Sequence, residues 1–547
     1  MNFLKGLSIR DRLLLAGGIL LALVVFGYFW RGVSGFAVDD SFIFFRYAEN
    51  IANGDGIVFN HGEIPGEGFT SWVWLMLLAA VRWFGFNLLP AAKIFGALFF
   101  LLSGVLVYLI TARLGTEGEK DNNTKLTGAF LAGLFLLNYR LLAHSVSGME
   151  TSLYIFSLLL LVYTVTRAWQ ADSSDYKWWL RVALCVTFIF LVRPEGLAAG
   201  GISLLALAAR HKGAVFKVRV WFYVVAGLVV PLVLFLAWKT HYFGYPLPLS
   251  FYHKVIGKQA VHRLATAEFF EFLKAYSVVI FPAILLVIHS LFVRKVKLFR
   301  YFTILTVVML MVYLNFLPVM NYLHRFYIPY LPLLLILLSP GIYYLLKAFT
   351  ASPNPAKRIV LVFLAFFVLV TAMNVEIRQS HGKVVNWKQM TNPAKYRARM
   401  GKLMRLLPPG TVVANTEMGV IPYFSTLTCL DMAGLTDPLV AHRGLSMEYL
   451  LERNTAIILF PRDVREMPER ELLNSPRNYG RVFLSPEFKE QFEYLDFFIA
   501  WPDNRNGYHF YINKKSLGYA AIRQWHEENI KEFAGEKRGK GAAQGRD

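Results

Sequence analysis

Two adjacent aspartates, Asp39 and Asp40, follow soon after the first long apolar run of the chain, Leu13 to Trp30. Carboxylates at the end of a membrane-length segment either mark the water interface or act on a substrate held at the bilayer surface. A carboxylate can also cap the helix expected to start here, because it accepts the unpaired backbone N–H groups of a first helical turn. Two neighbouring carboxylates cannot both cap the same helix, so one of them remains for another task.

The segment after this pair carries further charged residues and several glycines. It reads DDSFIFFRYAENIANGDGIVFNHGE, and the spacing of Asp39, Phe42 and Arg46 fits a helix in the membrane interface with the aspartates near its positive N-terminal end. Glu67 follows in the stretch GEIPGEGFT. We expect Arg46 and Glu67 to bind part of a polar substrate beside the acidic pair.

Further ionisable groups stand at the ends of later apolar runs, in the sequences HSVSGMET, RPEG, YPLPLSFYHK and NYLHRFYIPYLP. Each one alone is more often a residue that reaches for water or pairs with a neighbour. Several of them converging on the acidic pair would form a pocket in which cations hold a phosphate and a carboxylate activates a hydroxyl. The candidates for the phosphate are Arg193, His253, Lys254 and Arg325, and those for the rest of the substrate are His144, Glu150, Glu195 and His324.

The composition indicates that a membrane holds these groups. Hydrophobic residues make up 56% of the 547 residues and charged residues only 17%, which is typical of a protein with many spanning helices. A spanning helix needs about 20 mostly apolar residues, and the sequence contains eleven candidate segments, of which several must borrow flanking residues. They are Leu13 to Trp30, Leu88 to Ile110, Leu126 to Leu142, Ser152 to Ala168, Val182 to Leu191, Leu197 to Ala209, Trp221 to Trp238, Val278 to Val293, Phe302 to Leu317, Phe326 to Leu346 and Val360 to Met373.

Basic residues between these segments predict the orientation of the chain. They form four clusters: Lys5, Arg10 and Arg12; Arg210, Lys212, Lys217 and Arg219; Arg294, Lys295, Lys297 and Arg300; and Lys347, Lys357 and Arg358. With eleven crossings all four fall on one side, which the positive-inside rule identifies as the cytoplasm. This explains much of the net charge of +21, so we expect membrane lipids and a lipid-linked phosphate as partners and no nucleic acid.

On this topology residues 31–87 form the first outer loop, and the chain after about residue 374 also lies outside. The run Thr70 to Phe84 is short, and a further crossing there would place basic clusters on both sides. We therefore expect an interfacial or re-entrant helix. Residues 375–530 contain short apolar runs, GTVVANT, TAIILF and RVFLS, which alternate with polar turns and predict a soluble mixed α/β domain. Residues 531–547 have the composition of a disordered tail, and Cys185 and Cys429 are not expected to form a disulfide.

An outward-facing transferase needs a donor carried by the membrane, because sugar nucleotides are absent outside the cytoplasm. A polyprenyl-phosphate sugar meets this need. Its phosphate leaving group can be stabilised by Arg and Lys without an obligatory metal ion, while a carboxylate takes the proton of the acceptor hydroxyl. We predict no cofactor and no metal site.

Six runs in this order resemble the membrane glycosyltransferases of the GT-C superfold: DDSFIFFRYAENIANGDGIVFNHGE, EGFTSWVW, SGMET, RPEG, YPLPLSFYHK and RFYIPYLP. More narrowly, they resemble the terminal arabinofuranosyltransferases that complete mycobacterial cell-wall arabinan, and relatives in other bacteria that modify surface polymers or pilins. The stretch ANTEMGVIPYFSTLTCLDMAGLTDPLVAHRG is similar to the one that these proteins carry after their last span.

The resemblance implies that Asp39 and Asp40 match the catalytic acidic pair of the family. It also implies a polyprenyl-phosphate pentofuranose donor, such as decaprenyl-phosphoryl arabinofuranose, and a glycan or glycoprotein acceptor in the cell envelope. The chain departs from the family in GEIPGEGFT, which has an additional residue, and at His61 and Trp72, where the family often has Pro. Because this loop is expected to line the acceptor side, these departures concern the identity of the acceptor.

The sequence thus predicts a polytopic α-helical membrane protein of GT-C type with about eleven transmembrane helices and a C-terminal soluble α/β domain. Residues 1–374 are expected to form the catalytic domain in the bacterial inner (plasma) membrane, with the active site and C-terminal domain extracytoplasmic. One alternative is another GT-C transferase that moves aminoarabinose, mannose or another sugar to lipid A or protein. The other is a transporter or flippase of lipid-linked sugars, which predicts an internal repeat and ionisable residues near the membrane centre. Neither feature is clear in the sequence.

Overall fold

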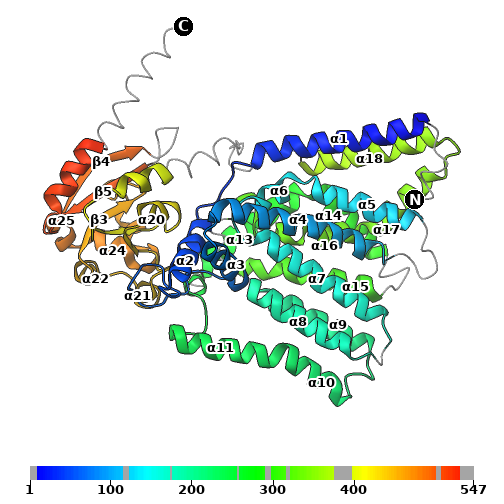
Figure 1. The fold of residues 1–547 in the computed structure, drawn as a ribbon, viewed down its shortest axis with the longest axis horizontal. Helices are drawn as coiled ribbons and strands as arrows, with labels where there is room; N and C mark the ends of the chain where they lie inside the picture. The colour runs from blue at the N-terminus through cyan, green and yellow to red at the C-terminus, as the bar shows by residue number, and fades with distance from the viewer. Residues whose placement is uncertain are drawn as a thin grey trace, which may run out of the picture.

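The computed structural model describes residues 9–114, 122–172, 175–254, 258–289, 297–315, 321–374, 397–499 and 507–529. Long helices form one unit, and a sheet with short helices forms a second unit at one end of it (Figure 1). We call them the helical unit, residues 9–374, and the C-terminal unit, residues 397–529, each within the described ranges. The predicted tail, residues 531–547, lies outside the described residues.

The helical unit contains most of the apolar sequence. Its helices are α1 (Ile9–Val33), α2 (Ser41–Asn53), α3 (Trp72–Trp83), α4 (Leu88–Thr111), α5 (Asn122–Leu136), α6 (Tyr139–Ser145), α7 (Thr151–Gln170), α8 (Lys177–Val192), α9 (Gly196–Arg210), α10 (Val218–Val224), α11 (Val230–Phe243), α12 (Leu249–Lys254), α13 (Lys258–Ala275), α14 (Ser277–His289), α15 (Lys297–Val312), α16 (Leu331–Leu337), α17 (Ser339–Thr350) and α18 (Pro355–Asn374). A π-helical turn, Val225–Val229, joins α10 to α11, and short 3-10 turns, Tyr322–His324 and Ile328–Tyr330, precede α16.

Several of these helices are long and apolar enough to cross a membrane. Within the described ranges five meet this test, and eight do so if each strongly bent helix pair counts as one span. The chain is therefore a multi-pass membrane protein. Each of the eleven segments predicted from the sequence overlaps a helix, although the shorter α8, α9 and α15 are not among these spans. The count of eleven crossings accordingly stays a prediction.

Two of the three bends between paired helices coincide with identifiable local features. The pair α5 and α6 is bent by 65°, and the Asn138 side chain at the break accepts the N–H of Leu141 and caps the second helix. Between α16 and α17 the bend is 47°, and Pro340 at the start of α17 has no N–H to donate to the preceding turn. Breaks of this kind inside a bundle are tolerated where side chains re-satisfy the freed backbone groups.

The first loop holds α2 and α3 at the end of the helical unit that faces the sheet (Figure 1). Helix α2 begins directly after the acidic pair and ends at Gly54, whose φ of 88° is readily adopted only by glycine. Helix α3 begins at Ser71, whose hydroxyl accepts the N–H of Trp74, and it spans only 12 residues. This length agrees with the expectation that Thr70 to Phe84 does not cross the membrane.

Two of the basic clusters lie toward the other end. In Figure 1 the connections between α9 and α10 and between α17 and α18, which carry two of the clusters, lie on the side of the N-terminus and away from the sheet. The remaining two clusters fall partly outside the described residues.

A five-stranded sheet organises the C-terminal unit. Its strands are β1 (Val412–Asn415), β2 (Thr428–Asp431), β3 (Thr455–Phe460), β4 (Phe492–Ile499) and β5 (Gly507–Asn513), in the order β2-β1-β3-β5-β4. Strands β2, β1 and β3 are parallel, and β5 and β4 continue the sheet in antiparallel pairs. All six residues of β3 are buried, as expected for a parallel strand covered on both faces.

Short helices complete this unit. They are α20 (Val420–Ser425), α21 (Pro438–Arg443), α22 (Met447–Glu452), α23 (Glu469–Leu473), α24 (Tyr479–Leu484), α25 (Pro486–Gln491) and helices over residues 397–404 and 519–529. Two of the apolar runs singled out in the sequence, GTVVANT and TAIILF, contain β1 and β3. The third, RVFLS, covers the last four residues of the helix α24 and its C-cap Ser485, with Val482 and Phe483 buried.

Candidate active site

The acidic pair lies in the connection between α1 and α2, where the two units meet. The Val38 N–H donates to the carbonyl of Ser147 at 3.0 Å and fixes this connection against the end of α6. Asp40 occupies the position before α2, yet its side chain makes no capping hydrogen bond there. Asp40 therefore does not cap α2 through its side chain, which was one role considered from the sequence.

The two carboxylates face different neighbours. Asp40 Oδ2 lies 3.2 Å from Nη1 of Arg325 in the helical unit. Asp39 Oδ1 accepts the N–H of Val420 at 3.1 Å and lies 3.4 Å from Nη1 of Arg397, and both partners belong to the C-terminal unit. The Asp40 side chain is 23% exposed and that of Asp39 is 8% exposed.

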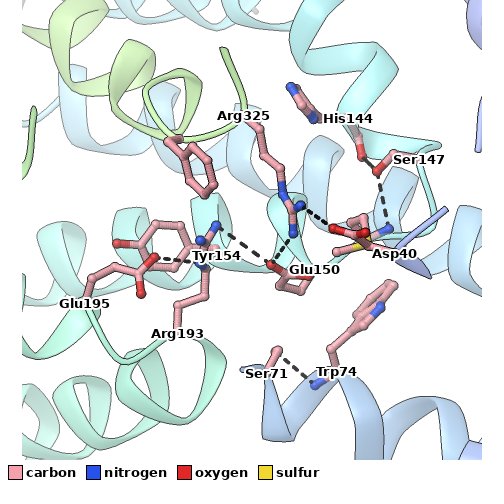
Figure 2. A network of polar contacts seen from close by, with 12 residues as sticks. Asp40, Ser71, Trp74, His144, Ser147, Glu150, Tyr154, Arg193, Glu195 and Arg325 are labelled. Carbon is pink, nitrogen blue, oxygen red and sulfur yellow. Dashed lines mark hydrogen bonds and ion pairs between the residues drawn. The ribbon is translucent and has the colours of Figure 1, made fainter. Parts of the chain in front are cut away.

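A buried polar network leads from Asp40 into the helical unit (Figure 2). The Nη2 atom of Arg325 lies 3.5 Å from Glu150 Oε1, and Nη1 of Arg193 lies 3.8 Å from the same oxygen. Arg193 also pairs with Glu195, with 2.7 Å between Nε and Oε1, and the Tyr313 hydroxyl donates to this carboxylate. Four residues predicted from three separate motifs are thus joined to Asp40 in one chain of contacts.

Glu150 is ionised within this network. Burial raises the pKa of Glu150, but the guanidinium groups of Arg325 and Arg193 outweigh burial and hold that pKa below its usual value. A buried carboxylate between two guanidinium groups offsets their mutual repulsion and directs their donors. Glu150 therefore serves as the central acceptor that orients both arginines.

The turn before α16 brings Arg325 to this position. Leu323 and His324 both have positive φ values, 51° and 60°. A non-glycine residue in this region costs about 1–2 kcal/mol, and such strain is concentrated at functional sites. His144 packs on the same turn: its Nε2 lies 3.3 Å from the Leu323 carbonyl oxygen.

His144 and His324 lie beside the network, and no contact between described residues joins either of them to the acidic pair. The His144 ring lies 5.4 Å from the Tyr322 ring, and the His324 ring packs against Phe272 at 5.8 Å. Both histidines are buried. Their roles as substrate-binding residues remain a prediction.

Arg46, a second predicted substrate-binding residue, lies in the contact between the two units. Its guanidinium donates to the carbonyls of Phe59 at 2.8 Å, Pro422 and Leu427 at 2.7 Å, and to Asn60 Oδ1 at 2.8 Å. These acceptors come from the first loop and from the C-terminal unit. Arg46 therefore joins the loop to the C-terminal unit.

Glu67 lies in the part of the first loop that precedes α3. Its Oε2 pairs with Lys239 Nζ at 2.7 Å, and its Oε1 accepts the indole N–H of Trp72 at 2.8 Å. Burial raises the pKa of Glu67 to about 7, although Lys239 opposes this. The contact with Lys239 attaches the loop to α11. No contact between described residues joins Glu67 to the network around Asp40.

Two predicted residues cannot be placed in the network. His253 and Lys254 end α12, and their side chains lie outside the described part of the chain. Within the described ranges no group of three or more His, Cys, Asp or Glu side chains is arranged to hold a metal ion.

Sequence reasoning missed the residues that the C-terminal unit contributes. Arg397 bridges Asp39 and Glu417, with 2.5 Å between its Nη2 and Glu417 Oε1. Burial raises the pKa of Glu417 to about 7, Arg397 opposes this, and Asp39 and Asp40 add to it. Burial also raises the pKa of Asp39, again opposed by Arg397. The only signal was the run ANTEMGVIPYF, which contains Glu417, Gly419 and Val420 and was singled out for its resemblance alone.

The comparisons with known proteins agree with this fold. Residues 384–511 match a family described as a domain of unknown function, DUF8728. A search of curated proteins found no match. Among solved structures, ArnT from Cupriavidus metallidurans bound to undecaprenyl phosphate is similar with a TM-score of 0.56 at 11% identity, covering 90% of this chain and 97% of ArnT.

A second solved structure is similar over a comparable length. It is the archaeal oligosaccharyltransferase AglB from Archaeoglobus fulgidus, in complex with an inhibitory peptide and a dolichol-phosphate, with a TM-score of 0.52 at 11% identity, covering 92% of this chain and 74% of AglB. ArnT and AglB are GT-C glycosyltransferases. At this identity the similarity concerns the fold. The chain therefore shares the fold of these two membrane proteins, in agreement with the expectation of a helical GT-C fold.

Proposed function

We propose that the protein is a polyprenyl-phosphate-dependent glycosyltransferase that moves a pentofuranose, with D-arabinofuranose as the first candidate, to a cell-surface glycan or glycoprotein. The observation that carries this proposal is the junction at Asp39 and Asp40. There an acidic pair, a buried arginine network and the C-terminal unit meet at one end of a GT-C helical unit. The lipid phosphates bound to ArnT and AglB support the class of donor. The first-loop sequence supports the choice of a furanose.

We assign different roles to the two aspartates. Asp39 takes the proton of the acceptor hydroxyl, and its burial suits this role because a raised pKa brings a carboxylate closer to neutral pH. Asp40 orients Arg325 through the contact at 3.2 Å. The acceptor oxygen then bonds to the anomeric carbon, the bond between that carbon and the phosphate oxygen breaks, and polyprenyl phosphate leaves with its electron pair.

The charges of the network bear on how the phosphate is held. Asp40, Glu150 and Glu195 are three carboxylates facing two guanidinium groups, those of Arg325 and Arg193. An entering phosphate competes with these carboxylates, so it needs further positive charge. His253 and Lys254 remain the candidates for this charge. In this proposal the two arginines are pre-oriented donors, and the end of α12 supplies the rest.

The proposed location follows from the charge pattern. The connection between α1 and α2, which contains the acidic pair, and the C-terminal unit lie at one end of the helical unit, and two basic connections lie toward the other (Figure 1). By the positive-inside rule the basic end is cytoplasmic. The site and the C-terminal unit would then be extracytoplasmic in a bacterial plasma membrane.

A donor panel tests the proposal. Purified protein is incubated with polyprenyl-phosphate arabinofuranose, aminoarabinose or mannose and with cell-envelope glycan or glycoprotein, and the product linkage is analysed. We expect transfer from the arabinofuranose donor and release of polyprenyl phosphate. Transfer from another donor alone would refute the sugar assignment. Movement of intact donor across liposomes without transfer would refute the glycosyltransferase and favour a transporter.

A further inference from the structure

The C-terminal unit touches the acidic pair directly. Its contacts with Asp39 come from two places: Arg397 in the helix over residues 397–404, and the segment that follows β1, with Gly419 and Val420. Val420 is separated from Asp39 by 381 positions in the chain. The carboxylate of Asp39 is therefore held by a part of the protein outside the helical unit.

The approach at Gly419 is close enough to exclude any side chain. A Cβ atom built there would lie 2.1 Å from the Asp39 carbonyl oxygen and 2.2 Å from Asp39 Oδ2. Glycine is needed here because the backbone of the C-terminal unit lies against Asp39.

Several buried contacts hold the two units in this position. Arg46 in α2 donates to the carbonyls of Pro422 and Leu427, and Asn60 pairs with both the N–H and the carbonyl of Cys429, at 3.0 and 2.9 Å. Hydrogen bonds of this kind between buried groups have strict geometry, and leaving one partner unpaired costs about 1–3 kcal/mol. The C-terminal unit is thus fixed on α2, the helix that begins at the acidic pair.

From these contacts we propose that Arg397 and Glu417 are positioning residues for Asp39, and that the active site is complete only with the C-terminal unit docked on the first loop. This inference rests on the proposed function, because it gives these two residues a part in the same proton transfer. Arg397 lies between the two carboxylates and shares its positive charge between them. Tyr508 on β5 accepts from Arg397 Nε at 3.0 Å and fixes the guanidinium from behind.

The groups that face Asp39 decide whether each substitution favours its protonated form or its carboxylate form. Arg397 and the Val420 N–H favour the carboxylate form of Asp39, whereas the negative charge of Asp40 disfavours it. Arg325 stands behind Asp40 and partly compensates its charge. Glu417 lies on the other side of Arg397, and the charges of Asp39 and Glu417 raise each other's affinity for protons. Removing Arg397 should therefore favour protonated Asp39, and removing the charge of Glu417 should favour the carboxylate.

Two substitutions should consequently displace the acid limb of the pH–rate profile in opposite directions. Transfer needs unprotonated Asp39, so its rate rises with pH until that proton is lost. In Arg397→Gln the limb should move to higher pH. In Glu417→Gln its part near neutral pH, where the Glu417 of the wild type carries charge, should move to lower pH. Arg397→Lys keeps the charge and should leave the limb close to that of the wild type. A residue with only a structural role would lower the rate without moving the limb.

The matched controls come from the same unit. Arg462 and Glu471 form an ion pair in which the side chains are 55% and 46% exposed, so Arg462→Gln and Glu471→Gln should change neither rate nor profile. Thermal unfolding and size-exclusion chromatography report folding of each variant. Glu417→Gln is isosteric, so it carries the test even if Arg397→Gln does not fold.

An infrared titration with isotope-labelled aspartate carboxyl groups makes the test independent of turnover. The Asp39 band is assigned by its loss in Asp39→Asn, and its titration is followed in the wild type, Arg397→Gln and Glu417→Gln. Displacement of the Asp39 titration in opposite directions in the two variants supports the inference. This holds even if the wild-type protein transfers no sugar, because that result refutes only the proposed function. Unchanged titration of Asp39 in folded Glu417→Gln, or displacement of both variants in the same direction, would overturn it.

Discussion

Substitution of Gly419 by alanine tests the contact between the C-terminal unit and Asp39 most sharply. The added Cβ atom would lie 2.1 Å from the Asp39 carbonyl oxygen, and heavy atoms in proteins essentially never approach a Cβ atom to less than 3.0 Å. The backbone at Asp39 and the segment after β1 must therefore separate by about 0.9 Å or more, the difference between these two distances. The methyl group itself removes no hydrogen bond and adds no charge.

The expected consequence is loss of turnover in a folded protein. A misplacement of about 1 Å at a reacting group can lower the rate by about 100-fold, whereas an additional methyl group in a packed contact costs about 1–3 kcal/mol of stability. We expect Gly419→Ala to lower the rate of sugar transfer by about 100-fold while donor binding changes little, because Arg193 and Arg325 lie on the other side of the pair. Transfer and donor binding are measured on purified protein, with the unfolding temperature as a check.

Gly518→Ala is the matched control for this experiment. Gly518 also lies in the C-terminal unit, and its nearest neighbour for a Cβ atom is Ile522 Cδ1 at 3.5 Å, an ordinary van der Waals distance. The Gly518→Ala variant should transfer sugar at the wild-type rate. Wild-type transfer by a folded Gly419→Ala would refute the reasoning, because Asp39 would then tolerate a displacement that the structure makes unavoidable.

Three further predictions concern the network, the docking contact and the topology. Arg193→Ala should weaken use of the donor, and Arg193→Lys should restore only part of it because the planar fork is lost; equal donor affinity and turnover in wild type and Arg193→Ala would place the phosphate elsewhere. Arg46→Ala should lower the free energy of unfolding by about 3 kcal/mol, since several charge-assisted hydrogen bonds are lost together, and an unchanged denaturant midpoint would contradict this. For the topology, single cysteines are placed at the exposed positions His61, Leu517 and Phe216 of a protein without its native cysteines, and intact cells are treated with a membrane-impermeant thiol reagent. The cysteines at His61 and Leu517 should react, and the one at Phe216 should not. Labelling of only one of the first two would contradict the eleven-span topology.

Local sequence patterns predicted the features that local chemistry determines. The apolar runs overlap helices, TAIILF forms β3, and the short run at Thr70 to Phe84 forms the 12-residue helix α3. The motifs around Glu150, Arg193 and Arg325 were singled out separately, and the structure joins them to Asp40. Ionisable groups at the ends of spans are costly to bury alone, which is why their presence in the sequence was informative.

Contacts between distant parts of the chain could not be predicted in this way. The hydrogen bonds of Arg46 to carbonyl groups in the C-terminal unit are one example, and its predicted role in binding substrate stays a prediction. The interaction of Arg397 and Glu417 with Asp39 depends on how that unit docks, and no spacing along the chain encodes it. Asp40 likewise looked like a helix cap by position, whereas its carboxylate turns to Arg325.

The most direct test of the central claim replaces each aspartate of the pair by asparagine. Asparagine has the size of aspartate and caps a helix about as well, but it can neither accept the proton nor supply the charge. Sugar transfer by purified Asp39→Asn should fall by about 100-fold to 10,000-fold, the range expected for loss of a general base, while the protein stays monodisperse and binds donor lipid. Asp40→Asn should retain more transfer and weaken donor use instead. Full transfer activity in Asp39→Asn would contradict the role given to Asp39, and full activity in both variants would contradict the proposed mechanism as a whole.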